Sequence, residues 1–216
     1  MASVKLGTKA VGSIVKLNES GSPVEFVVAH QDSPSGAYSG FEGGTLLVRK
    51  DIYSSRQWNA KYYGANDYAD SGIHSFLNNT YLGLLDTDIQ AAVKQIRIPY
   101  RPGGGDSTTV YSGSSGLLCK AFLLSMREVG LTNSYAPQEG VTLDWFSTAG
   151  NTARIAYSGS YASRWWLRTP SLVSSGNYVF VVTNSGNLDN EIVDNSYGVR
   201  PTLVLDAELY VDDDGN

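Results

Sequence analysis

The sequence predicts an α+β fold, with short helices in the middle of the chain and β-structure at both ends. β-rich segments separated by Gly-, Ser- and Asn-rich turns occupy the first 50 residues and the residues after 160. Apolar residues recur at helical spacing only between residues 71 and 130. The chain has 216 residues, of which 42% are hydrophobic and 17% charged, which is enough for one buried core. We therefore expect strands from the two ends to pair in a shared sheet.

The N-terminal part predicts a hairpin followed by a third strand. Residues 11–17 and 24–30 are β-rich, and the Asn-Glu-Ser-Gly-Ser-Pro segment at 18–23 between them is typical of a turn. A third strand is expected over residues 45–49, after a Gly-rich loop.

Three helices are expected in the middle of the chain. Ser71 can cap the first helix, which has an apolar face over residues 73–77. Residues 87–90 have the form of a capping box, with Thr at the N-cap and Gln three residues later. A third and longer helix would end at Gly130. Its apolar stripe is expected to consist of Leu117, Leu118, Ala121, Phe122, Leu124 and Val129.

Short strands separated by polar turns are expected in the rest of the chain. They are predicted over residues 96–100, 164–168, 178–182, 198–200 and 202–205. The Asn-Ser-Gly-Asn segment at 184–187 is typical of a hairpin turn. No segment has the composition of a linker, so one domain is expected over residues 1–211. Residues 212–216 are expected to form an acidic C-terminal tail.

Two motifs near the C-terminus carry a resemblance to a known family. Residues 165–170 read Trp-Trp-Leu-Arg-Thr-Pro, and residues 197–203 read Tyr-Gly-Val-Arg-Pro-Thr-Leu. This pair resembles an uncharacterised domain family that is frequent in phages and prophages of Gram-positive gut bacteria. The opening hairpin and residues 71–78 and 122–125 also match the habits of that family, so the resemblance covers nearly the whole chain.

The resemblance implies a C-type-lectin-like fold, because the family looks distantly like the formylglycine-generating-enzyme branch of that fold. A mixed sheet with a few short helices is therefore expected. The implied function is that of a non-enzymatic bacteriophage virion protein, structural or binding, in a tail, fibre or particle surface. Its partners would be other virion proteins and a glycan or protein of the host surface, and it could form a homo-oligomer. A bacterial cell-surface or secreted binding domain is the alternative.

The four large motif residues are expected to be structural. Adjacent strand residues point to opposite faces, so Trp165 or Trp166 should fill the core while the other packs under a loop. Stacking of one indole on a sugar is the sharper alternative. Arg168 and Arg200 are expected to bind loop carbonyls or a carboxylate such as Asp144.

Neither a catalytic site nor a cofactor is predicted. The enzymes of the related fold use a pair of cysteines, whereas this chain has only Cys119, in an apolar segment. The two histidines, His30 and His74, lack the spacing of metal ligands and are expected to be half-buried. Calcium is a weaker alternative, because residues 189–191 and 194–195 offer oxygen ligands.

A ligand is expected to meet the polar loops between residues 174 and 197. Tyr supplies rigid amphipathic area and Asn supplies adaptable hydrogen bonds, as in binding loops generally. The candidate ligand-binding residues are Tyr178, Asn184, Asn187, Asp189, Asn190, Asn195 and Tyr197. Hairpin turns use the same residue types, so a structural role stays open. A second aromatic cluster, either a surface or a packing element, is formed by Trp58, Tyr62, Tyr63 and Tyr68.

Charge and hydropathy restrict the partners and the location. The net charge is −5 and the basic residues are scattered, which argues against a nucleic acid partner. No apolar run is long enough to span a membrane, and the N-terminus lacks the apolar segment of a signal peptide. We therefore expect synthesis in a host cytoplasm and a place in the virion.

Overall fold

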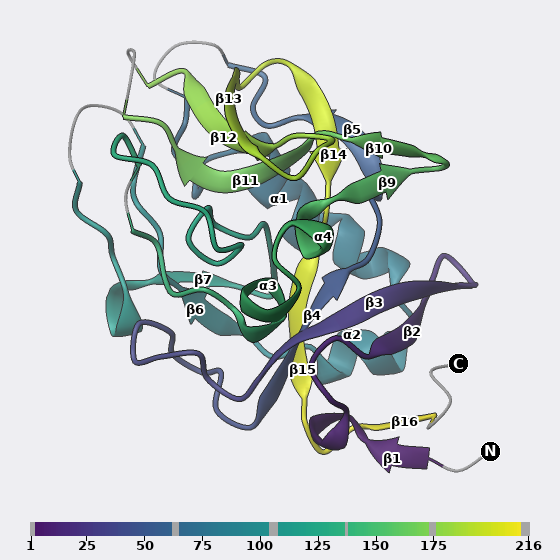
Figure 1. Cartoon of the computed structure of the whole chain (residues 1–216). Coiled ribbons are helices and arrows are strands. Elements are labelled where there is room, and N and C mark those ends of the chain that lie inside the picture. The colour runs from purple at the N-terminus through teal and green to yellow at the C-terminus, as the bar shows by residue number, and fades with distance from the viewer. Residues whose placement is uncertain (1–2, 62–64, 104–107, 137, 173–175, 213–216) are drawn as a thin grey trace.

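The structure is a computed structural model that describes residues 3–61, 65–103, 108–136, 138–172 and 176–212. Within these residues the protein consists mostly of β-sheet with a few short helices, so the predicted α+β class is confirmed. Figure 1 shows two main sheets, one above the other, with the two chain ends close together below them.

The lower sheet joins the two ends of the chain. Its strand order is β2 (Ile14–Glu19), β3 (Ser22–Gln31), β4 (Gly44–Arg49), β15 (Thr202–Asp206) and β8 (Ala121–Phe122). All four pairings are antiparallel, and the β2–β3 hairpin confirms the first predicted turn. Ser20 and Gly21 at this turn have positive φ, as a tight hairpin requires. Because β15 lies beside β4, the expected pairing of N-terminal and C-terminal strands is also confirmed.

The upper sheet carries both C-terminal motifs. Its strand order is β13 (Leu188–Ile192), β12 (Tyr178–Val182), β11 (Trp165–Pro170), β14 (Ser196–Val199) and β5 (Ser54–Gln57). All six residues of β11 are buried. Beside it, Gly198 donates its N–H to the carbonyl of Arg164 at 2.9 Å. A Cβ at position 198 would lie 2.8 Å from that oxygen, so the close parallel approach of β14 to β11 requires glycine.

Three small sheets and several short helices complete the described structure. The two-stranded sheets pair β1 (Ser3–Lys5) with β16 (Tyr210–Asp212), β9 (Ala156–Ser158) with β10 (Tyr161–Ser163), and β6 (Ile96–Ile98) with β7 (Leu117–Cys119). The α-helices are α1 (Gly72–Asn79), α2 (Thr87–Ala92), α3 (Asp144–Ala149) and α4 (Asn151–Arg154). Single 3-10 turns occur at Leu6–Thr8, Tyr81–Leu84 and Gly113–Ser115. Asp212 ends β16, so it is not part of a tail, and residues 213–216 lie outside the described residues.

The first two helices agree with the sequence in position but differ in their caps. The Ser71 hydroxyl accepts the N–H of His74 at 3.1 Å, so the predicted cap of α1 is confirmed. α2 begins at Thr87 without a side-chain cap, so the predicted capping box does not form. The Gln90 side chain donates to the Leu85 carbonyl instead.

The predicted third helix, over residues 117–129, is wrong. Its first half forms the short strands β7 and β8, which pair with β6 and β15. In the second half, side chains from distant segments accept hydrogen bonds from the backbone. The Tyr68 hydroxyl accepts the N–H of Leu123, and the Thr169 hydroxyl accepts the N–H of Met126. The apolar residues here reflect burial on nearly all sides rather than one helical face. The structure also contains α3 and α4, which the sequence did not predict because such short helices carry no apolar repeat.

Both motif tryptophans are fully buried. Trp165 and Trp166 each have 0% exposure, and their indole N–H groups donate at 2.8 Å to the carbonyls of Arg154 and Arg56. Stacking of either ring on a sugar is therefore ruled out. Trp58 and Tyr68 are also fully buried, so they belong to the core rather than to an aromatic surface. Tyr62 and Tyr63 lie outside the described residues.

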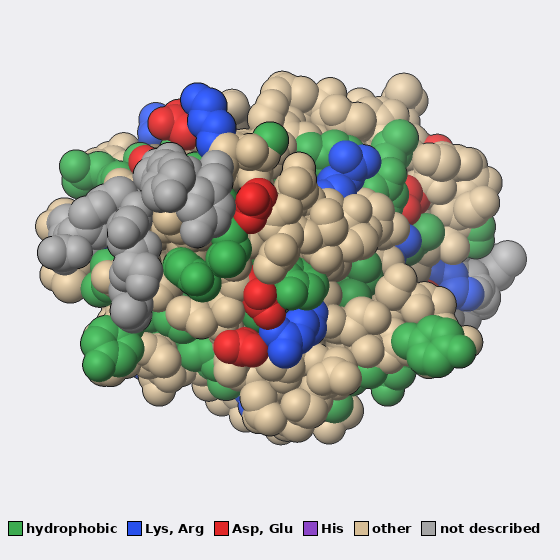
Figure 2. Space-filling view, turned by 90° about the horizontal axis from the view of Figure 1, so that it is seen from above, with side chains coloured by type: hydrophobic (Ala, Val, Ile, Leu, Met, Phe, Trp, Pro, Cys, Tyr) green, Lys and Arg blue, Asp and Glu red, His purple; other side chains and the backbone are tan. Residues whose placement is uncertain are grey.

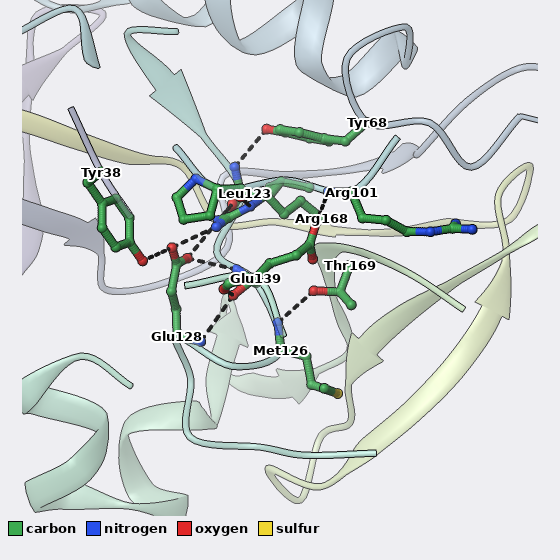
Figure 3. A network of polar contacts seen from close by, with 11 residues as sticks. Tyr38, Tyr68, Arg101, Leu123, Met126, Glu128, Glu139, Arg168 and Thr169 are labelled. Carbon is green, nitrogen blue, oxygen red and sulfur yellow. Dashed lines mark hydrogen bonds and ion pairs between the residues drawn. The ribbon is translucent and has the colours of Figure 1, made fainter. Parts of the chain in front are cut away.

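An ion pair with no solvent exposure connects the upper sheet to the segment after β8. Arg168 of β11 donates to both Glu128 oxygens, at 2.6 and 2.7 Å (Figure 3). The same guanidinium donates to the carbonyls of Pro99 and Leu123 at 3.0 and 2.8 Å. Burial opposes the charge of Arg168, but attraction and hydrogen bonding to Glu128 raise its pKa. The partner suggested by the sequence, Asp144, instead lies 3.1 Å from His30.

Glu128 is itself held by two further donors. The Tyr38 hydroxyl donates to Oε1 at 2.5 Å (Figure 3). The backbone N–H of Ser125 donates to Oε2 at 2.8 Å. Burial, followed by the negative charge of Glu128, raises the pKa of Tyr38 well above its usual value. Each oxygen of the buried Glu128 carboxylate therefore accepts two hydrogen bonds.

The second motif arginine is held by carbonyls. Arg200 donates to Arg49, Lys50 and Ala153 at 2.9 to 3.0 Å. Its guanidinium lies 5.4 and 5.0 Å from the ring centres of Trp145 and Trp165. Burial lowers the pKa of this arginine. The residue thus fixes the chain after β4 against α4 and the indole of β11.

Replacing Trp165 or Trp166 by Ala should destabilise the protein by about 3–5 kcal/mol, because each substitution removes a fully buried ring. Urea unfolding measures this. Tyr161→Ala is the control, since that ring is 80% exposed and should leave the stability nearly unchanged. A tryptophan variant as stable as the control would contradict the buried placement.

Glu128→Gln should destabilise the protein by about 3–5 kcal/mol, because the shape is kept while the buried Arg168 charge loses its partner. Arg168→Met should have a similar effect, and the double variant should cost clearly less than the sum of the two. Glu25→Gln breaks an ion pair with Lys50 in which both side chains are more than 40% exposed, so it serves as the control. Additive losses in the double variant would show that the two groups are not coupled.

Candidate functional site

The predicted ligand-binding residues all lie on strands β12, β13 and β14 of the upper sheet or in the connections between them. Tyr178 begins β12, Asp189 and Asn190 are in β13, and Tyr197 is in β14. Asn184 and Asn187 lie in the β12–β13 turn, and Asn195 lies between β13 and β14. Figure 2 views this end of the molecule from above and shows a surface that is mainly polar and uncharged. Asp189 and Asn190 are consecutive in the strand and project to opposite faces of it, so the seven residues form no single cluster.

One asparagine of the hairpin turn, Asn187, helps to hold the turn together. The N–H of Thr183 donates to the Asn187 carbonyl at 2.8 Å, and the Asn187 amide donates to the Ser185 hydroxyl at 3.2 Å. Gly186 has a φ of 79°, which favours glycine. The predicted hairpin turn at 184–187 is therefore confirmed, and Asn187 has a structural use within it.

A charged cluster links Arg164, the residue before β11, to β13 across the intervening strand β12. Arg164 contacts Asp189 at 3.0 Å and forms a second, shorter ion pair with Glu191. Asn195 donates to the other Glu191 oxygen at 3.2 Å. The guanidinium also lies 5.9 Å from the ring centre of Tyr197. Arg164 was not among the candidates from the sequence, because both acids that bind it are more than 20 residues away.

Tyr178 and Tyr197 are only partly available to a ligand. Both are partly buried, and the Tyr197 ring packs edge-on against Trp166 at a centroid distance of 5.1 Å. Burial, followed by the hydrogen bond to Glu191, raises the pKa of the Tyr197 hydroxyl. Of the two expected anchors, Tyr197 is therefore fixed by the charged cluster and by the core.

A hollow of about 300 Å³ opens beside β13 and contains two of the predicted residues. We call it the Tyr135 hollow, after its most exposed ring, which is 59% accessible. Phe180 and Leu188 supply apolar area to it. The complete lining consists of Thr132, Asn133, Tyr135, Ser171, Phe180, Leu188, Asp189 and Asn190.

The loop that carries Tyr135 is fixed by hydrogen bonds. The Asn133 side-chain oxygen accepts the N–H of Tyr135 at 2.8 Å, and the Tyr135 carbonyl accepts the N–H of Leu172 at 2.9 Å. The loop is thereby tied to the end of β11. Sequence reasoning missed this loop, although its Thr-Asn-Ser-Tyr composition at 132–135 is the one that singled out residues 174–197.

Several polar groups of the hollow have no hydrogen-bond partner among the described residues. They are the Asn190 amide, the Asn133 amide nitrogen and the hydroxyls of Thr132 and Tyr135. The Asp189 carboxylate differs, because Arg164 and the Asn190 N–H already bind it. The hollow therefore combines an exposed aromatic ring with amide and hydroxyl groups that have no partner among the described residues, while the Asp189 carboxylate is engaged by Arg164. Such a set can bind a neutral polar ligand.

Groups suited to acid–base or metal chemistry are not assembled in this hollow. Cys119 is buried, and burial raises the pKa of its thiol to about 12. His74 is packed against Tyr68, and burial lowers its pKa. Over the described ranges, no three His, Cys, Asp or Glu side chains are grouped closely enough to hold a metal ion. In the same ranges, no helix has the length and apolar character needed to cross a membrane.

Comparison with known proteins assigns a family. Neither the curated proteins nor the solved structures include a match to the chain. A family model described as a domain of unknown function, DUF6273, matches residues 42–207. The matched region extends from the loop before β4 to the end of β15, and it includes both C-terminal motifs and the Tyr135 hollow. Because the match covers most of its length, this chain belongs to the DUF6273 family.

Proposed function

We propose that this chain is a non-catalytic binding domain of a bacteriophage particle, and that the Tyr135 hollow binds a saccharide of the host cell surface. The observation that carries the proposal is the pairing of an exposed tyrosine ring with the Asn190 amide and the Asn133 amide nitrogen, which have no partner among the described residues, on a fixed strand and loop. The phage setting rests on the resemblance of the paired motifs at 165–170 and 197–203 to a phage and prophage family.

The composition of the hollow suits a sugar ring better than a charged or wholly apolar ligand. One face of a pyranose is lined by C–H groups, which pack on an aromatic ring. Its hydroxyls both donate and accept hydrogen bonds; the Asn190 amide can do both, and the Asn133 amide nitrogen can donate. A volume of about 300 Å³ is at the lower end of ligand pockets, so one or two sugar units would fill it.

We also propose that the fold is C-type-lectin-like, of the formylglycine-generating-enzyme branch. Two features support this assignment: the pairing of β1 with β16 at the chain ends, and the motif resemblance at the end of the chain. The enzymes of that branch need two cysteines, whereas this chain has one, which is buried in β7. A binding role is therefore the better expectation for this member of the branch.

The tail, the fibres and the particle surface are the proposed locations, with other virion proteins as neighbours. A bacterial cell-surface or secreted domain that binds a carbohydrate or protein is the second candidate. The Tyr135 hollow would serve either setting, so the setting needs its own experiment.

Tyr135→Ala should weaken saccharide binding about tenfold or more, because it removes the stacking surface of the hollow. Asn190→Ala should weaken it about tenfold, because it removes hydrogen bonds to sugar hydroxyls. The measurement is binding of purified protein to an array of surface polysaccharides from Gram-positive gut bacteria. Tyr161→Ala, which removes an exposed ring outside the hollow, is the matched control.

Equal melting temperatures of the three variants would show that the fold is intact. Binding to no polysaccharide, or equal binding by wild type and both hollow variants, would overturn the saccharide assignment. Loss of saccharide binding in the Tyr161 variant alone would show that the binding site lies at the β9–β10 hairpin instead.

If the chain is a virion component, it should sediment with infectious particles through a density gradient. Mass spectrometry of the particle fraction measures this, and a host cytoplasmic enzyme serves as the contamination control. Recovery only in the host envelope or in the culture medium would favour the bacterial binding domain instead.

A further inference from the structure

The edge strand β5 is the most exposed strand at the margins of the two main sheets. Ser55, Arg56 and Gln57 are all exposed, whereas the other margins, formed by β13, β2 and β8, contain one exposed residue between them. Only one side of β5 is paired, through its antiparallel ladder with β14. The backbone groups on its other side are those that an added strand would use.

Two hollows flank this strand and meet on it. One, of about 290 Å³, includes Ile52, Ser158 and Tyr197 in its lining. The other, of about 400 Å³, includes Arg56, Ile73 and Phe76. Ser55 and Ser196 line both, so the two hollows adjoin along the β5–β14 pair, and we call them together the Arg56 groove. Side chains of an extended peptide alternate in direction, so such a peptide on β5 would have room for them in the groove.

Arg56 is positioned to bind a carboxylate in this groove. Its guanidinium carbon lies 3.6 Å from the centre of the Phe76 ring, and its Nε donates to the Ser54 hydroxyl at 3.2 Å. These two contacts fix the plane of the group and leave both Nη atoms without a hydrogen bond to the described residues. A stacked guanidinium with two free terminal nitrogens presents the fork that carboxylates bind bidentately.

The charge of the groove around Arg56 is not neutralised locally. None of the described residues lining the 400 Å³ hollow is Asp or Glu, and Arg56 forms no ion pair with the described part of the chain. This contrasts with Arg164, which is bound by two acids. The complementary ligand group is therefore negatively charged.

We propose that β5 is a docking strand for an extended acidic peptide of a partner protein, which adds to the upper sheet and places a carboxylate on Arg56. The exposed backbone of β5 would supply the main-chain hydrogen bonds, and the groove would select the side chains. This site is separate from the Tyr135 hollow and does not depend on the saccharide proposal.

The test begins with selection of ten-residue peptides from a random displayed library on wild-type protein, without any counter-selection. We expect the enriched peptides to share an Asp or Glu at a fixed position. Arg56→Gln should weaken their binding at least tenfold, and Arg56→Lys should restore it only in part, since Lys lacks the planar fork. Arg127→Gln, which removes one positive charge outside the groove, should bind as wild type.

Hydrogen exchange distinguishes strand addition from a surface charge effect. A bound peptide should slow amide exchange within residues 54–57 and leave the Tyr135 loop unchanged. The proposal is overturned by failure to enrich any peptide, by enriched peptides that bind the Arg56→Gln variant equally, or by protection elsewhere. Binding of free glucuronate in place of peptides, if lost in Arg56→Gln, would also overturn it and would assign the groove to acidic sugars.

Discussion

The ion pair between Arg168 and Glu128 is the contact on which most of the interior depends. Arg168 is on the fully buried strand β11, and its guanidinium makes four hydrogen bonds, to the Pro99 carbonyl after β6, to the Leu123 carbonyl after β8 and to both oxygens of Glu128. Because neither side chain has any exposure, the cost of removing both charges from water is offset only if the geometry is closely kept. The pair thus fixes the position of β11 in the upper sheet relative to the segment that follows β8 of the lower sheet.

This constraint explains why residues 123–131 are ordered without regular secondary structure. Their backbone groups are bonded by Tyr68, Thr169 and Glu128 rather than by a helix or a sheet. Ser125 adds a hydrogen bond to the Glu139 carbonyl at 2.6 Å, which fastens the following loop to the same interior. The surface loop with Tyr135 therefore leaves from a rigid base, and a rigid base is what lets a loop present groups for binding.

The strands were predictable from the sequence, but their partners were not. Alternating apolar residues and Gly/Asn turns correctly indicated β2, β3, β4, β12 and β15, since these signals are local. The helix expected over 117–129 failed because residues 121–129 are buried on nearly all sides, which periodicity cannot distinguish from one buried face, and because Leu118 of the expected stripe is 44% exposed. Glu128 was not recognised as the partner of Arg168 because 40 residues separate them and nothing local marks the pairing.

Of the candidate site, the sequence likewise predicted some residues but not the ones they lie beside. The composition of residues 174–197 identified Asp189 and Asn190, which do line the Tyr135 hollow. It also selected Asn187, whose side chain stabilises its own turn, because turns and binding loops share residue types. Tyr135 and Arg164 come from other parts of the chain, and only the folded structure brings them to β13. Arg56 needed the structure as well, since its stacking on Phe76 joins β5 to α1.

The strand order of the upper sheet places the two proposed sites on opposite sides of that sheet. The Tyr135 hollow lies beside β13 and the Arg56 groove beside β5, and these are the opposite margins of the sheet. Four strand-to-strand steps separate them, which is about 19 Å at the usual spacing. A saccharide at one margin and a peptide at the other would therefore not collide. Since β11 and its Arg168–Glu128 pair lie between them and are fully buried, neither ligand would have to disturb the core. One rigid sheet could hold the domain to a neighbouring protein by one edge and present the other edge to a cell surface.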